Sequence, residues 1–265
     1  MEADRPEKQP NDEAVGPPSE PEEQLSYDDE GALVSRFLMQ DGKLEGEGVT
    51  YYPSGAVAQQ LPYKNGVLHG KMTAYDEAGQ VTQVFHFVDG LLHGPASIYD
   101  EAGQPVQQLH YQNGLLHGEG LLYDLGLLRV RISFVEGVKE GEVQVFHENG
   151  QLSEQAAYEA GHRHGDTVHY SVDGNVLQEA VYQQDLLDGE VVTHDPKGGV
   201  SQKAHYKAGV LDGRVLRYHP NGKLKEKAIY KAGQLQGEPV EYDKKGKRVK
   251  KDKKGGLFSF LTGGS

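Results

Sequence analysis

Apolar and polar positions alternate in a seven-residue segment that recurs along the chain. In residues 57–63, alternate positions hold Val57, Gln59, Leu61 and Tyr63, and with a period of two these side chains share one face of a β-strand. Similar segments follow at 81–87, 105–111, 152–158, 176–182, 200–206 and 224–230. The other face is mostly polar and holds Gln60, His86, Gln108, Gln155, Glu179, Lys203, Lys225 and Lys227. The pattern predicts antiparallel strands with one packed face and one solvated face.

Turn residues separate these segments. Residues 71–75 form a shorter extended segment, which is followed by the turn Asp76-Glu77-Ala78-Gly79. The longer segment at 81–87 ends at a second turn, Asp89-Gly90. Glycine at such places supplies the positive φ that tight turns need. Two extended segments joined in this way predict a β-hairpin.

The hairpin pattern repeats at an almost fixed step. One glycine position recurs every 24 residues, with a single step of 23, as Gly46, Gly70, Gly94, Gly118, Gly141, Gly165, Gly189, Gly213 and Gly237. A period in the twenties indicates a repeat array in which each unit packs on its neighbours. We therefore predict an all-β fold: about nine to ten 24-residue β-hairpins that form one elongated, twisted antiparallel sheet.

Composition divides the chain into three parts. Residues 1–24 are acidic and proline-rich, and we expect them to be disordered. Residues 25–247 hold the repeats, and residues 248–265 are expected to form a basic, flexible tail that contains Gly and Phe. Hydrophobic residues make up 36% of the chain, which suits a thin sheet better than a globule with a central core.

Cysteine content and hydropathy bear on the compartment and the chemistry. The chain has no cysteine, which removes disulfides and thiol catalysis. No apolar run approaches the ~20 residues that span a bilayer, and the N-terminus lacks the basic and apolar regions of a secretory signal. We therefore expect a cytoplasmic protein, with peripheral attachment to the inner membrane as an alternative.

Charge is unevenly distributed along the chain. Residues 1–50 hold 14 acidic and 4 basic residues, whereas residues 201–265 hold 6 and 16, and the net charge is −13. One interpretation is that excess acid keeps an exposed sheet soluble. The alternative is that the acidic array steers towards a cationic partner.

A Gln or Glu recurs on the packed face, at Gln59, Gln178 and Glu226 among other places. A half-buried polar group needs a partner, or it costs ~1–3 kcal/mol. These groups are copied in every repeat, so we interpret them as structural groups that bond the turn amides of the next hairpin. The chain has neither a G-x-S-x-G elbow nor a phosphate-binding loop, and we expect neither an enzyme nor a cofactor.

Histidine or an acid often precedes the periodic glycine, at His69, His93, His117, His164, Asp188 and Asp212. Three interpretations are open for these residues. They form a partner-binding edge, they are solvated turn residues, or the stacked imidazoles collect a metal ion. We carry them forward as a candidate partner-binding edge, without assigning a metal.

Three repeats depart from the pattern. The repeat with Tyr123-Asp124-Leu125-Gly126 lacks one residue and carries Arg129 and Arg131, which marks it as a candidate contact site. Asp185 replaces a turn glycine and His194 replaces the recurrent aromatic residue. We expect these two replacements to weaken their repeats without ending the array.

The tail joins a basic run to a small apolar cluster. Residues 244–254 carry eight bases and one acid. The candidate anchor residues are Lys250, Lys251, Lys253, Lys254, Leu257, Phe258, Phe260 and Leu261. The tail could insert at an anionic membrane surface, dock in a groove of a partner, or fold back on the acidic N-terminus. Nucleic acid is not expected as a partner, because no aromatic residues interleave the bases.

The repeats resemble a known family. YDEAGQPVQQLHYQNGLLHGEG, FHENGQLSEQAAYEAGHRHGDT and YHPNGKLKEKAIYKAGQLQGEP share the motif Y-x-x-x-G-x-[LV]-x-x-x-x-x-Y-x-x-G-x-x-x-G. They resemble the variant MORN repeat of bacterial proteins, in particular the YwqK-type antitoxin family, some of whose members serve as immunity proteins. The resemblance covers about 220 residues in some nine copies. It implies a non-enzymatic binder that neutralises a cognate toxin or effector by occlusion. The alternative is a scaffold or membrane-tethered interaction protein that uses the tail.

Overall fold

The computed structural model describes residues 20–249, and in this range the chain folds into β-strands and turns. The prediction of an all-β fold built from antiparallel hairpins is confirmed. The chain divides into two compact bodies, residues 1–103 and 104–265, and each is described by itself. No helix within residues 20–249 is long and apolar enough to cross a membrane.

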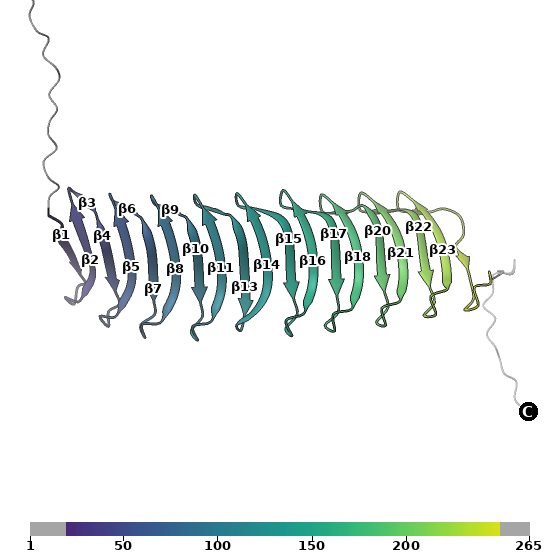
Figure 1. The fold of residues 1–265 in the computed structure, drawn as a ribbon, viewed down its shortest axis with the longest axis horizontal. Coiled ribbons are helices and arrows are strands. Elements are labelled where there is room, and N and C mark those ends of the chain that lie inside the picture. The colour runs from purple at the N-terminus through teal and green to yellow at the C-terminus, as the bar shows by residue number, and fades with distance from the viewer. Residues whose placement is uncertain (1–19, 250–265) are drawn as a thin grey trace, which may run out of the picture. The chain divides into compact units, whose positions relative to one another are not determined.

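The N-terminal body is a row of antiparallel hairpins (Figure 1). Its strands are β1 (Glu22–Tyr27), β2 (Leu33–Gln40), β3 (Lys43–Leu44), β4 (Gly46–Tyr51), β5 (Val57–Lys64), β6 (Val67–Leu68), β7 (Gly70–Tyr75), β8 (Val81–Val88), β9 (Leu91–Leu92) and β10 (Gly94–Tyr99). Each first strand pairs with the second strand of its own hairpin, as β4 does with β5. Each second strand also pairs with the next hairpin, as β5 does with β7.

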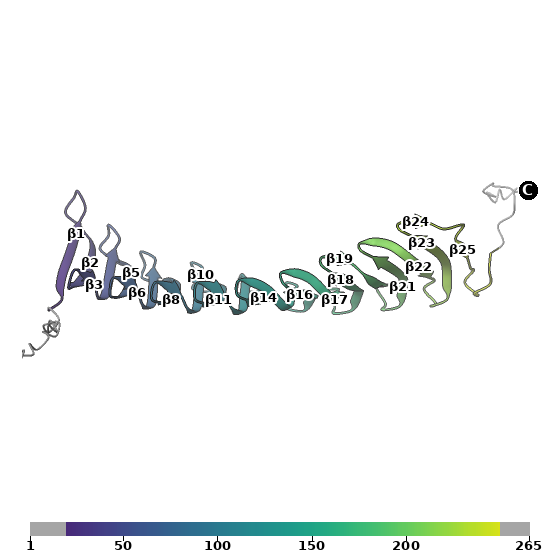
Figure 2. The same cartoon turned by 90° about the horizontal axis from the view of Figure 1, so that it is seen from above.

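The C-terminal body continues the same scheme, and successive hairpins stand side by side when seen from above (Figure 2). Its strands are β11 (Pro105–Gln112), β12 (Leu115–Leu116), β13 (Gly118–Asp124), β14 (Leu127–Val135), β15 (Val138–Phe146), β16 (Leu152–Glu159), β17 (His162–Tyr170), β18 (Val176–Gln183), β19 (Leu186–Leu187), β20 (Gly189–His194), β21 (Val200–Lys207), β22 (Val210–Tyr218), β23 (Leu224–Lys231), β24 (Gln234–Leu235) and β25 (Val240–Glu241). All its strand pairs are antiparallel, for example β16 with β17 and β22 with β23.

Two kinds of turn set the register of the hairpins. Within a hairpin, the carboxylate of Asp76 accepts a hydrogen bond from the amide of Gln80 at 2.8 Å, and Gly79 has φ +80°. Between hairpins, Asn65 and Gly66 have φ of 52° and 88°. Two consecutive residues with positive φ form a two-residue type I′ turn, whose twist matches that of antiparallel strands. The Asp/Gly and Asn/Gly signals in the sequence therefore mark the two rows of turns, one at each end of the strands.

The packed face is the one that the alternation predicts. Ala156, Ala180, Ala204 and Ala228 are at most 3% exposed. One such cluster joins Ala204 and Ala228 to Val215, with two tyrosines and Leu211 against it. The opposite face is not wholly solvent-exposed, since Val49 and Thr73 on that face are also buried.

The ends of the predicted domains differ slightly from the strands observed. β1 begins at Glu22, so residues 22–24 of the segment expected to be disordered belong to a strand. At the other end, Arg248 pairs with Tyr242 and the amide of Val249 bonds the carbonyl of Glu241 at 2.8 Å, so residues 248 and 249 of the expected tail also pair with the sheet. The candidate tail anchors from Lys250 to Leu261 lie outside the described residues.

Candidate protein-binding surface

The predicted His/Asp edge lies directly after the short strands, at the type I′ turns. Asp188 Oδ2 accepts the amide of Ala208 at 3.1 Å, and Asp212 Oδ2 accepts the amide of Ala232 at 3.1 Å. Glu140 Oε2 accepts the amide of Ala160 in the same way at 2.9 Å. Each acid therefore binds the turn of the next repeat. The turn-amide contact that we expected of the packed-face Gln and Glu is made by these edge acids instead.

The histidines of this edge occupy the equivalent place. His69 Nδ1 lies 3.2 Å from Asp89 Oδ1 in the following turn, and His164 Nδ1 lies 3.5 Å from Glu159 Oε2. His93 and His117 donate their backbone amides to the carbonyls of the second strand of the same repeat, at 2.8 and 2.9 Å. Within residues 20–249, no group of three His, Asp or Glu side chains is placed to hold a metal ion.

A row of exposed apolar residues runs beside this edge, two residues before His69, His93, His117, Glu140, Asp188 and Asp212, whereas His162 takes the corresponding place before His164. We call it the apolar edge row. It comprises Val67 and Leu91 in the N-terminal body, and Leu115, Val138, Leu186 and Val210 in the C-terminal body. These side chains are 42–52% exposed. Val67, Leu115, Val138 and Leu186 each lie beside the turn glycine of the next repeat, as Leu186 does beside Gly209, while their outer surfaces remain open.

Two hollows open on the polar face next to this edge in the C-terminal body. The first, of about 470 Å³, is lined by His110, His117 and Glu119 among other residues. The second, of about 560 Å³, is lined by His205, Asp212 and Arg214 among others. Each is lined by a glycine with positive φ, Gly118 at the start of β13 and Gly213 within β22. The repeat thus places a predicted edge residue at the rim of each hollow.

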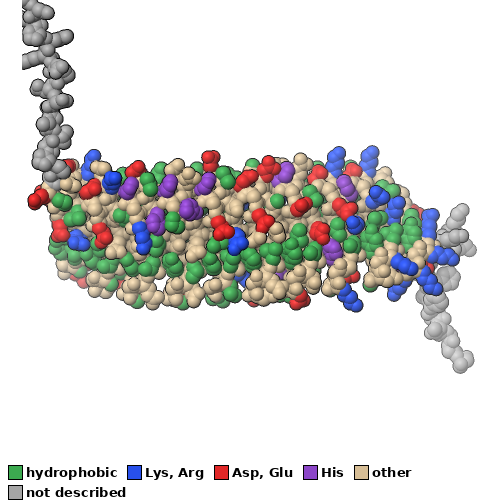
Figure 3. All heavy atoms as spheres, in the orientation of Figure 1, with side chains coloured by type: hydrophobic (Ala, Val, Ile, Leu, Met, Phe, Trp, Pro, Cys, Tyr) green, Lys and Arg blue, Asp and Glu red, His purple; other side chains and the backbone are tan. Residues whose placement is uncertain are grey.

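Figure 3 shows how side chains are distributed on one face of each body. Histidine and acidic side chains gather there, with an apolar band running below them. A surface that combines exposed apolar groups with polar groups is typical of a protein-binding site. The polar groups are held in fixed positions, as in the 2.8 Å ion pair between Lys203 Nζ and Glu190 Oε1. The hydrogen bond to Glu190 raises the pKa of Lys203.

The arginines of the short repeat are held by acids within the C-terminal body. Arg131 Nε lies 3.1 Å from Glu119 Oε1, and Arg129 lies 3.9 Å from Asp124 and 3.8 Å from Glu148. Arg131 remains 45% exposed, so it still presents a charged surface beside the first hollow.

Sequence reasoning missed a charged cluster on the packed face. Arg163 donates to Glu154 at 2.5 Å and to the hydroxyl of Tyr158 at 3.2 Å, and it lies 5.6 Å from the ring of Tyr182. His169 Nδ1 lies 3.5 Å from the other oxygen of Glu154. Partial burial acts to lower the pKa of Arg163, but the contacts with Tyr158 and Glu154 outweigh it and raise that pKa.

The signal for this cluster was present in the repeat alignment. The place of Arg163 is taken by leucine in most other repeats, as at Leu187 and Leu211, and Lys139 is the second exception. Lys139 Nζ lies 5.4 Å from the ring of Tyr158. A cation at an apolar repeat position therefore predicts a cation–π contact with the tyrosine series.

Asp185 keeps its turn intact, contrary to our expectation that it weakens the repeat. Its φ is 64°, and its amide bonds the carbonyl of Arg163 at 3.0 Å, as the equivalent glycines do. Its carboxylate also binds His162 Nδ1 at 2.6 Å and the amide of Arg163 at 2.7 Å. The hydrogen bond from His162, followed by that from the Arg163 amide, lowers the pKa of Asp185.

His194 is the other residue that departs from the repeat pattern. His194 is largely buried, with Nε2 at 3.8 Å from Glu179 Oε1. Its Nδ1 has no hydrogen-bond partner among the described residues.

The comparisons with known proteins agree with the repeat architecture. The MORN repeat variant family matches residues 44–65, 68–89, 92–113, 139–160 and 211–232. These five segments cover 110 of the 265 residues, and their repeats are similar to the MORN repeat variant. No curated protein matched the chain.

Two solved structures illustrate the more distant similarities. A chain in the crystal structure of TcdB2-TccC3-Cdc42 is 14% identical, with 86% of this chain and 16% of that chain covered and a TM-score of 0.21. A chain in the Photorhabdus luminescens Tc holotoxin pore with a TccC3 mutation is also 14% identical, with 85% and 15% covered and a TM-score of 0.21. This chain spans only a small part of either, and TM-scores this low carry no argument about function.

Proposed function

We propose that the chain is a non-enzymatic binding protein that takes a protein partner along the turn edge of its C-terminal body. The apolar edge row is the observation that carries this proposal. Leu115, Val138, Leu186 and Val210 expose apolar surface at one repeat position. Successive repeat positions are two strands, about 10 Å, apart, and His162 takes the place between Val138 and Leu186.

The flanking polar groups supply specificity to this contact. His117 and Asp212 line the two hollows beside the row; Asp212 accepts the amide of Ala232 in the next turn, and the backbone amide of His117 bonds the carbonyl of His110. Preorganised groups lose little conformational entropy on binding, which favours affinity. We further propose that the partner is a cognate toxin or effector, neutralised when the bound array covers its active surface.

Co-purification with edge variants tests this function. Full-length tagged protein is used to capture partners from the cells that encode it, in parallel with Leu186→Asp/Val210→Asp. The matched control, Glu148→Lys/Lys197→Glu, changes charge at the opposite turns. We expect one stoichiometric partner to be retained by the control and lost by the edge variant, and co-expression of the chain to relieve that partner's toxicity. Retention by the edge variant contradicts the proposed site, and absence of rescue contradicts neutralisation.

A second candidate function is a scaffold held at the inner membrane, suggested by Lys250, Lys251, Lys253 and Lys254 beside Leu257, Phe258, Phe260 and Leu261. Deletion of residues 250–265 separates the two functions. The deletion abolishes activity if the tail tethers a scaffold, and leaves neutralisation intact if the edge row binds a toxin.

A further inference from the structure

The first strand of the N-terminal body has an open edge. Among the described residues, β1 pairs with β2 and with no other strand. All six of its residues are exposed, including Leu25 and Tyr27. The unpaired N–H and C=O groups of an edge strand are a template for another strand. The outer side of β1 is therefore an interaction surface that the sheet leaves unused.

The strand pairing between repeats shows which kind of strand fits the outer side of β1. β1 takes the place of β7, because Tyr27 and Tyr75 belong to the same recurrent position. The outer side of β7 pairs with the second strand of the preceding repeat, with Ala74 opposite Gln59 and Thr73 opposite Gln60. The natural occupant of the open edge of β1 is thus a second strand that ends an array of the same kind.

Residues 248 and 249, the last that the structure describes, supply the start of such a strand. Tyr242 pairs with Arg248 across a turn in which the Asp243 carboxylate accepts the amides of Lys245 and Lys247, both at 2.9 Å. Residues 248 and 249 therefore start the second strand of a last hairpin. The chain continues for 16 residues beyond Val249, and Lys250 stands 24 residues after Glu226, at the position that Gln59 occupies in its own repeat.

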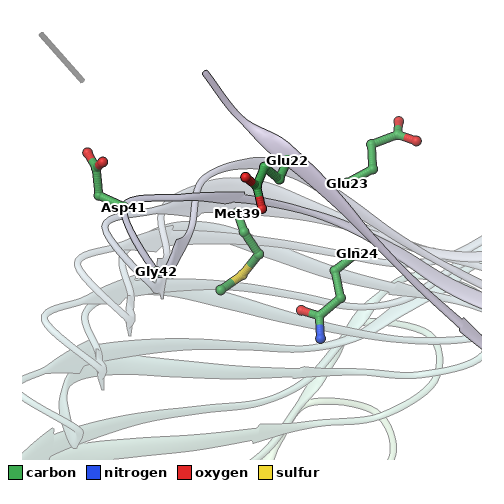
Figure 4. Close-up of a pocket in the computed structure, with 6 residues that line it drawn as sticks. All are labelled: Glu22, Glu23, Gln24, Met39, Asp41 and Gly42. Atoms are coloured by element: carbon green, nitrogen blue, oxygen red, sulfur yellow. The ribbon is translucent and has the colours of Figure 1, made fainter. Parts of the chain in front are cut away.

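Charge complementarity favours the basic C-terminal segment as the strand that pairs with β1. The edge of β1 carries Glu22 and Glu23, and a hollow of about 440 Å³ beside it is lined by these residues together with Gln24, Met39, Asp41 and Gly42 (Figure 4). The opposite end of the chain carries Lys244, Lys245, Lys247 and Arg248, followed by four further lysines. An acidic edge and a basic strand attract each other, whereas two β1 edges bring acids together.

We propose that the chain associates head to tail, with the segment from Arg248 to Lys254 of one copy pairing with the outer edge of β1 of a second copy. The register seen between repeats sets Lys250 opposite Ser26, and Lys251 opposite Leu25, of the second copy. The same antiparallel register then sets Lys253 and Lys254 opposite Glu23 and Glu22. β1 has glutamate at the place where β7 has the kinked Gly70, so the pairing extends along the whole strand. The contact is heterologous and leaves one free end of each kind, so it builds open chains of copies.

Sedimentation of the full chain tests the association. At 50 mM salt we expect the average mass to rise with protein concentration, and at 500 mM salt we expect the association constant to fall at least tenfold because screening weakens the charge pairs. Glu22→Lys/Glu23→Lys alone, or Lys253→Glu/Lys254→Glu alone, is expected to remain monomeric. An equimolar mixture of the two variants is expected to associate again. A monomer at all concentrations, or association that ignores both charge reversals, overturns the proposal.

Engineered cysteines test the register, since the chain has none of its own. Copies with Ser26→Cys and copies with Lys250→Cys are mixed and oxidised. We expect a mixed disulfide to form at least tenfold faster than in the off-register control, Ser26→Cys with Lys254→Cys, because only opposed Cβ atoms lie within bonding reach. Equal rates for the two pairs, or a predominance of Ser26→Cys self-disulfide, contradict the head-to-tail register.

Discussion

Thr167 is a polar residue at a buried repeat position that is otherwise apolar. It is 1% exposed, and its hydroxyl has no hydrogen-bond partner among residues 20–249. The equivalent positions hold Val143, Val191 and Val215, all buried. Thr167→Val is expected to stabilise the chain by about 1 kcal/mol, because it removes an unsatisfied buried polar group of nearly the same shape. Urea denaturation checks this, and an unchanged or lower midpoint contradicts it.

The Glu154–Arg163 pair is a second departure at the residue scale. Removal of Arg163 leaves a carboxylate that is only 19% exposed without its main partner. Arg163→Leu is therefore expected to cost about 1 kcal/mol. Glu154→Gln/Arg163→Leu recreates the Gln and Leu found at Gln178 and Leu187, and we expect it to recover most of that loss. Urea denaturation of the four proteins of this double-mutant cycle measures the coupling, and additive effects contradict a direct pair.

The contribution of Asp185 to the stability of the fold is expected to fall as the pH is lowered. Its hydrogen bonds lower its pKa in the folded state below the ordinary value of 3.8. Its contribution to stability is therefore complete above pH 3.8 and is lost as the pH falls through the lower, folded pKa. Melting temperatures of the wild type and Asp185→Asn, measured from pH 6 to pH 2, are expected to differ most at the upper end and to converge at the lower. A difference that does not depend on pH contradicts this assignment.

At the scale of the hairpin, the edge acids join each repeat to the next. The Asp188 carboxylate accepts the amide of Ala208, and Asp212 accepts that of Ala232. Asp188→Ala is expected to speed hydrogen exchange at Ala208 several-fold and to leave Ala232 unchanged, and Asp212→Ala should do the reverse. Exposed Asp166 gives a control, Asp166→Ala, that should alter neither amide. Exchange measured by NMR contradicts this role if both amides respond alike to each variant.

The opposite turns are joined by a different set of groups. His147 Nε2 donates to the carbonyl of Tyr170 at 3.1 Å, and Asn149 donates to that of Val172 at 2.8 Å, each 23 residues further along. His219 and Asn221 make the same two contacts with the last hairpin. The repeats that carry these groups are therefore bonded to the next repeat through their turns as well as through the strands.

The sequence predicted the hairpins well because their determinants are local. Alternation, Asp/Gly turns and a fixed step each act within about 24 residues, and the strands follow them closely. The site was less predictable because it depends on contacts between repeats. The roles of Asp188 and Arg163 are set by the next repeat's turn and by the neighbouring strand, and a single hairpin shows neither. The apolar edge row was visible in the sequence only as a Val or Leu after most of these turns, without its exposure.

At the scale of the molecule, the proposed function rests on the repetition of one surface position. An active site brings different catalytic groups together at one point, whereas this chain presents similar side chains at regular intervals. The members of the apolar edge row in the C-terminal body occupy one repeat position and one edge. Such a surface suits an extended partner contact, and its energy is expected to concentrate in a few central residues.

Photocrosslinking from single positions tests the binding edge most directly. A photoreactive phenylalanine analogue is placed at Leu115, Leu186 or Val210 on the apolar edge row, and at Glu148 or Lys197 on the opposite turns as controls. The full chain is then irradiated in the cells that encode it. We predict one discrete protein adduct, the same from all three row positions and absent from both controls. An adduct that forms only from the opposite turns, or no discrete adduct from the row, contradicts the proposal that this edge binds the partner.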